Sequence, residues 1–181
     1  MAKFIIAKTL TIQIENYSHG RPYIQMEMTM SYSLRDIIEI IKMYTNYTDI
    51  YDWSFRNPYE EDKNLSLTKD KEKIENTSFS EYRNVTPYVV CYYGPIKIHL
   101  GVRGFKKYTK VYPTIYMAEG RFPTEKEFAD NIRISDMDMK RNKDELKDLD
   151  DRMKKYFKSK YKISDEVDES STFKNNKLVS I

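Results

Sequence analysis

The stretch from Pro87 to Met117 constrains the fold most, because it holds the most strand-like residues of the chain. Residues 88–93 (YVVCYY) are a continuous apolar run, which predicts a strand buried on both faces. A Gly-Pro turn signal follows, and residues 96–103 then alternate between apolar and mostly basic positions. The basic positions are Lys97, His99 and Arg103, and Gly101 lies among them. This alternation predicts a second strand with one apolar face and one basic face.

Two shorter alternating runs near the N-terminus predict a hairpin. Residues 4–14 and 23–30 each alternate, with apolar side chains at every second position except Lys8, and a turn cluster (NYSHGRP, residues 16–22) separates them. Ser33 is a good N-cap with Asp36 three residues later, and an apolar stripe at helical spacing begins at Leu34. We therefore expect a helix that packs across the apolar face of the hairpin.

The remaining segments predict one polar excursion and a helical C-terminal third. Residues 57–83 are polar and poor in aliphatic side chains, so we expect a long excursion that contains a short helix at 68–75. Thr124 and Glu127 form a capping box for a short helix that reaches residue 132. A longer, highly charged helix is predicted from Ser135 to about Ser159, with a narrow apolar seam.

These segments together predict an α+β fold. We expect an antiparallel sheet of about five strands with an N-terminal hairpin, one packed helix, a C-terminal helical extension and a polar tail. The predicted division is a compact domain at residues 1–133, a protruding amphipathic charged helix at 134–163 and a polar tail at 164–181. A mean hydropathy of −0.74 agrees with a modest core and solvated segments.

The sequence argues against an enzyme. The chain has one cysteine and two histidines, so no disulfide framework and no zinc-ligand cluster can be built from them. Cys91 lies in an apolar run, where a thiol is inert. Five glycines in 181 residues do not form a phosphate-binding loop motif. We therefore predict no catalytic residues, no metal site and no cofactor.

Two clusters are candidates for binding a partner. The first is the predicted C-terminal helix, whose apolar seam and basic residues suit another protein subunit. Its candidate residues are Met139, Leu146, Leu149, Met153, Phe157, Arg152, Lys154, Lys155 and Lys158. The second is the basic segment at 94–121, where six Lys or Arg residues accompany a single Glu and several tyrosines. Its candidate residues for contact with nucleic acid or an acidic partner are Lys97, Arg103, Lys106, Lys107, Tyr108 and Lys110.

The leading functional prediction is a non-enzymatic structural protein that docks on other subunits of a larger complex as a homo- or hetero-oligomer. The Lys-, Asn-, Ile- and Tyr-rich composition favours a phage virion component, such as a head, connector or tail-ring subunit. The alternative is an accessory protein that binds nucleic acid, or modulates a host, through the basic aromatic sheet face. The start of the chain lacks a signal-peptide core and no stretch reaches membrane-span length, so we expect a cytoplasmic protein without membrane contact, incorporated into a virion in the phage version.

Overall fold

The structure is a computed structural model. It describes residues 6–14, 22–28, 32–56, 67–68, 70–79, 82, 88–107, 113–130 and 143–161. For residues 6–14, 67–68, 88, 102–107, 116 and 143, the description covers the backbone alone. The elements run in the order β1 (Ile6–Ile14), β2 (Tyr23–Met28), α1 (Leu34–Thr45), β3 (Trp53–Arg56), β4 (Leu67–Thr68), α2 (Lys71–Asn76), β5 (Tyr88–Tyr93), β6 (Ile96–Lys107), β7 (Thr114–Glu119), α4 (Glu125–Ala129) and α5 (Lys143–Tyr161).

The strands form one antiparallel sheet, which confirms the predicted α+β class. The strand order is β4-β3-β5-β6-β1-β2-β7, so the long β1 and β6 pair near the middle. The sheet has seven strands rather than about five. The additional strands are the short β3 and β4, at one end of the strand order. The sequence around Trp53 is compatible with either a short strand or an aromatic loop, and the structure has the strand, which pairs with β5 and with β4. Strand β4 lies within the predicted polar excursion. A strand as short as the two-residue β4 carries no alternation that sequence reading can detect.

The predicted N-terminal hairpin is present. β1 and β2 pair antiparallel, with Leu10 opposite Met26. In β2, Ile24, Met26 and Met28 are fully buried while the residues between them are half-buried. Period-two alternation has therefore given the strand one core face and one outer face.

Helix α1 covers the core face of the sheet, as predicted. Its N-terminus is a capping box, in which the Ser33 hydroxyl accepts from the Asp36 N–H and the Asp36 carboxylate accepts from the Ser33 N–H. The helix ends at Asn46, which adopts the left-handed conformation common at helix C-termini. Ile37, Ile41 and other apolar residues of α1 are fully buried in the core.

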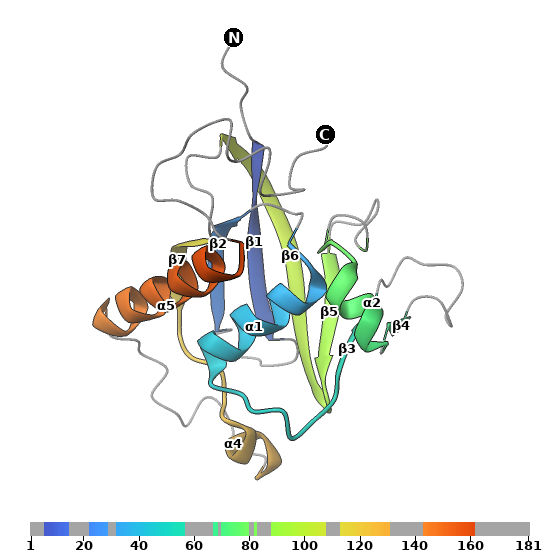
Figure 1. Cartoon of the computed structure of the whole chain (residues 1–181). Helices are drawn as coiled ribbons and strands as arrows, with labels where there is room; N and C mark the ends of the chain where they lie inside the picture. The colour runs from blue at the N-terminus through green and yellow to red at the C-terminus, as the bar shows by residue number, and fades with distance from the viewer. Residues whose placement is uncertain are drawn as a thin grey trace.

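Helix α5 does not stand apart from the domain. It packs against α1 and β7, and Figure 1 shows its C-terminal half lying across the same side of the sheet as α1. Leu149, Met153 and Phe157 are at most 1% exposed and belong to the same core cluster as α1 and the sheet. The Phe157 ring lies 4.6 Å from the Tyr32 ring, centroid to centroid. The prediction of a protruding helix is therefore corrected for α5 from Leu149 to Phe157, since the seam over these residues is buried within its own chain.

The helices α1, α2 and α5 form one layer on one side of the sheet (Figure 1). Within the predicted polar excursion, the described part contains β4 and α2, and α2 is close to the short helix that we expected. The capping box of Thr124 and Glu127 is present at α4. In the part of the chain that the structure describes, no helix combines the length and apolar character needed to cross a membrane.

Candidate partner-binding surface

One face of the sheet carries none of the described helices, and we call it the open sheet face. Two groups of described residues point to it by strand alternation and register. The first group lies on β3, β5 and β6: Ser54, Arg56, Val90, Tyr92, Lys97, His99 and Gly101. The second group lies on β2 and β7: Tyr23, Gln25, Glu27, Thr114, Met117 and Glu119.

The first group is a cationic half of the open sheet face. Tyr92 is opposite Lys97 in register, and the Lys97 ammonium lies 6.0 Å from the centroid of the Tyr92 ring. Val90 is paired with Arg56 on one side and His99 on the other, and it is 6% exposed. Arg56 and Lys97 are the charged members, and no carboxylate occurs among the side chains described in this half.

The second group is an acidic half of the same face. The Tyr23 hydroxyl donates to the Met117 sulfur at 2.9 Å, and Met117 is 45% exposed. Desolvation raises the pKa of Tyr23, and the nearby Glu119 carboxylate raises it further by electrostatic repulsion of the phenolate. Glu27 lies on the same face. Among the described side chains of this half there is no lysine or arginine.

Gly101 sits near the centre of the open sheet face. Its backbone pairs with Tyr88 on one side and Thr11 on the other. A Cβ atom added at Gly101 would meet no atom within 4 Å. Since the fold leaves room for a side chain here, packing inside the chain does not require this glycine. A glycine within a strand often marks a place where another molecule approaches the backbone closely.

A second polar cluster joins α1 to α5. The Asp36 carboxylate is fully buried, and it accepts hydrogen bonds from the Lys160 ammonium at 2.6 Å and from the Tyr161 hydroxyl. Desolvation and the hydrogen bond to Asp36 both raise the pKa of Tyr161. Desolvation lowers the pKa of Lys160, but its hydrogen bond and attraction to Asp36 outweigh that effect and raise it. These groups stabilise one another, so the cluster is a structural connection between two helices.

A third cluster surrounds Tyr93 at the end of the sheet near α4. The Tyr93 ring stacks on Trp53 at 4.3 Å, and its hydroxyl donates to the Glu125 carboxylate or the Thr48 carbonyl. Burial, followed by the hydrogen bond to Glu125, raises the pKa of Tyr93 to about 12. Glu125 also accepts from the Thr48 N–H at 2.7 Å. The carboxylate is used to hold two segments together.

Two ionisable groups that could have suggested catalysis, Asp49 and Cys91, are held within the fold. Asp49 accepts from Lys42 at 2.8 Å and from the Trp53 indole at 3.1 Å, and the bond to Lys42 is the main reason that its pKa is lowered. Burial raises the pKa of the Cys91 thiol. Within the described residues, no three or more His, Cys, Asp or Glu side chains are arranged to hold a metal ion.

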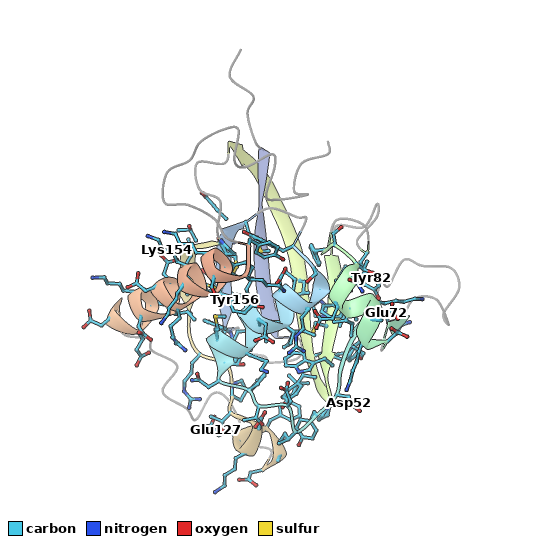
Figure 2. The ribbon with its side chains drawn as sticks, viewed as in Figure 1. Asp52, Glu72, Tyr82, Glu127, Lys154 and Tyr156 are labelled. Carbon is cyan, nitrogen blue, oxygen red and sulfur yellow. The ribbon has the colours of Figure 1, made fainter. Side chains whose placement is uncertain are left out.

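The structure places several of the residues predicted to bind a partner on the C-terminal helix inside the core instead. Leu149, Met153 and Phe157 are core residues, so they cannot form the proposed apolar contact with another subunit. Met139 lies outside the described residues. The remaining members are on the surface of α5: Leu146, Lys154 and Lys158 are half-buried, and Arg152 and Lys155 are exposed. Figure 2 shows Lys154 on the upper side of α5.

The structure describes only part of the predicted basic cluster. Lys97 lies on the open sheet face. For Arg103, Lys106 and Lys107, the description covers the backbone of β6, and Tyr108 and Lys110 lie outside the described residues. Sequence reasoning missed the contribution of β3 and of the acidic half on β2 and β7. The alternation of residues 23–28 was a signal for that half, but we used it only to identify the core.

Comparison with known proteins adds one observation about the fold. No protein-family model and no curated protein matches the chain. The chain is similar to the crystal structure of MM3350 from Methanosarcina mazei Go1, which is described as a protein of unknown function. The similarity has a TM-score of 0.55 at 13% sequence identity, and it covers 81% of this chain and 88% of that chain. The overall fold therefore also occurs in a solved protein with very different residues.

Proposed function

We propose that this protein is a non-enzymatic assembly protein that docks on another protein subunit through the open sheet face. The observation that carries the proposal is the one-sided construction of the sheet. Helices cover one face, and the other displays half-buried aromatic and polar side chains around a glycine with open space above it. Tyrosine is enriched at interfaces because it combines a large apolar ring with a polar tip.

The charge distribution favours a protein over a nucleic acid as the partner. Lys97 beside Tyr92 would suit a phosphate next to a stacked base. The acidic half, with Glu27 and Glu119, would repel phosphates that extend across the same face. A protein partner can present opposite charges to both halves. Membership of a virion stays a prediction from composition.

The roles of the ionisable clusters support a non-enzymatic protein. The carboxylates of Asp36, Asp49 and Glu125 each accept hydrogen bonds from their own chain and hold neighbouring segments together. A general acid or base needs reach to a substrate as well as a suitable pKa. These carboxylates already serve the fold.

Site-specific photo-crosslinking in the native host tests the proposal. A benzophenone amino acid replaces Tyr92 on the open sheet face, and a control variant carries it at Glu72, which is exposed on α2 in the helical layer (Figure 2). We expect a discrete protein adduct from position 92 and none from position 72. Gly101→Thr should abolish the adduct, since it adds a side chain where the partner approaches. The same adducts from both positions, or none from either, would refute the proposal, and a nucleic-acid adduct would replace it.

A further inference from the structure

We propose that the partner of the open sheet face is a second copy of this chain, stacked face to face across a two-fold axis. This inference rests on the proposed function and names its partner. The opposite charges lie in separate halves of the face, with Arg56 and Lys97 on the β3-β5-β6 side and Glu27 and Glu119 on the β2-β7 side. A surface with both signs in separate halves can be complementary to itself.

The strand order determines which two-fold axis satisfies this complementarity. Strand β1 lies between β6 and β2, so it separates the cationic half from the acidic half. An axis that runs between the two sheets along β1 places β5 and β6 of one copy over β2 and β7 of the other. An axis across the strands would instead place each half on its own equivalent and oppose like charges. The charges therefore select the first arrangement, in which the strands of the two copies run in similar directions, as in aligned sheet packing.

The register then identifies which residues meet. Tyr23 is paired with Glu119 on one side of the sheet, and Val90 is paired with His99 on the other. Backbone pairing through Gln13 places all four in one row across the face. Rotation about the β1 axis brings His99 over Tyr23 of the second copy, and Val90 over Glu119. Lys97 is two residues from His99 along β6, within reach of that Glu119.

Gly101 lies near the axis in this arrangement. It is on β6, one strand from β1, and its backbone pairs with Thr11. The axis brings Gly101 of each copy opposite Gln25 of the other copy. Since glycine has no side chain, the two sheets can approach closely at these two places. Any side chain at this position fits the single chain but would separate the two sheets. Since the other contacts are mostly polar, we expect a dimer that weakens with added salt.

The test is sedimentation equilibrium of the purified full chain in 50 mM and 500 mM NaCl. We expect a species of twice the 21.7 kDa chain mass that dissociates in the higher salt. Lys97→Glu and Glu119→Lys should each weaken dimerisation about tenfold, and the double variant should recover most of the loss. A mixture of the two single variants should form a mixed dimer. Glu72→Lys and Lys126→Glu are matched charge reversals on other exposed surfaces and should have no effect.

Several results would overturn the inference. A chain that stays monomeric at 100 μM in low salt excludes this interface. A dimer whose dissociation constant is unchanged by both charge reversals also excludes it. Failure of the double variant to recover also excludes it, because compensation within one chain requires that both residues meet across identical copies. The two proposals fail separately. A monomer whose position 92 still gives a specific adduct with a different protein keeps the docking function and loses the second copy, whereas a monomer with no adduct loses both.

Discussion

Replacing Asp36 by alanine should destabilise the whole domain, because this carboxylate joins α1 to α5. Asp36 is fully buried and accepts from the Ser33 N–H at 3.0 Å, the Lys160 ammonium at 2.6 Å and the Tyr161 hydroxyl. The Lys160 side chain is 34% exposed, so we count its lost ion pair at only about 1 kcal/mol. The Tyr161 hydroxyl loses its Asp36 acceptor, which costs about 1 kcal/mol. Loss of the capping box adds about 1 kcal/mol.

We therefore expect Asp36→Ala to lower the free energy of unfolding by about 3 kcal/mol. Lys160→Met should cost about 2 kcal/mol, since it leaves the buried carboxylate without its cation but with two hydrogen-bond donors. The double variant should lose about 1 kcal/mol less than the sum of the single losses. Asp148→Ala is a matched control, because its partner Arg152 is on the exposed side of the same helix and the pair should contribute under about 0.5 kcal/mol.

Urea unfolding followed by two probes measures these values. Trp53 is the single tryptophan, and it reports on β3, while far-UV circular dichroism reports mainly on the helices. Figure 1 places β3 and α5 on opposite sides of the view, so the probes examine distant parts of the domain. We expect coincident transitions. A helical transition at lower urea than the tryptophan transition, or a loss under 1 kcal/mol for Asp36→Ala, would show that α5 is an appendage and would refute our reasoning.

Four other predictions follow from single contacts. The hydrogen bonds with Arg121 lower the pKa of Glu127 to about 2. This pair should therefore stabilise the fold above about pH 4.5, and the stabilisation should be lost as the pH falls toward 2. Arg121→Gln should remove this part of the acid dependence of the free energy of unfolding. Cys91 should react with a thiol reagent only after unfolding, since burial raises its pKa and protects it; a rapid reaction of the native protein would contradict its buried position. Gly94→Ala should cost about 2 kcal/mol in urea unfolding, because Gly94 has a φ of 54° and the new Cβ would lie 2.7 Å from a tyrosine ring carbon. Gly101→Thr should instead gain about 0.5 kcal/mol when unfolding is followed in 500 mM NaCl, where the proposed dimer is dissociated, because a β-branched residue favours a strand and the site has open space. A loss above about 1 kcal/mol under that condition would contradict this geometry.

Alkaline unfolding offers an independent check on the connection between α1 and α5. The pKa values of Lys160 and Tyr161 are both raised in the folded chain. A raised folded pKa means that the protonated form is favoured by folding, so each group stabilises the domain below its ordinary pKa of about 10. That stabilisation should disappear as the pH rises above about 10. Unfolding measured between pH 8 and 11 should show a shallower decline in Asp36→Ala than in the natural chain, and equal slopes would contradict the connection.

Local patterns predicted the elements well, because each depends on neighbouring residues. The alternation at 23–28, the capping box at Ser33 and the strands on either side of Gly94 all appear in the structure close to where the sequence placed them. Their signals are a period of two, a period of 3.6 and the specific chemistry of helix ends and turns. The two-residue β4 was missed, and for the four-residue β3 a strand and a loop could not be told apart, since so few residues do not show a period.

The partner of an apolar seam could not be predicted in the same way. The spacing of Leu149, Met153 and Phe157 indicates a narrow contact, and it has the same form whether the opposite surface belongs to this chain or to another. The pairing of Lys160 with Asp36, 124 residues apart in the sequence, shows that the seam faces this chain's own α1. A single sequence contains no local signal for a contact at that separation. Counting charges on the helix therefore suggested an external partner for a seam that is internal.

Because the apolar seam of α5 is buried, the open sheet face becomes the main candidate surface for binding a partner. The apolar residues of α5 complete the helical layer. The inner side of that layer packs on the sheet, and its outer side carries charged residues that face solvent. The open sheet face has no corresponding cover among the described elements, although it holds tyrosines, a nearly buried valine and a central glycine. A surface with separated charges gains specificity when it meets a surface with the complementary arrangement. The separation of charge on either side of β1 is therefore the feature that makes a second copy the partner to test first.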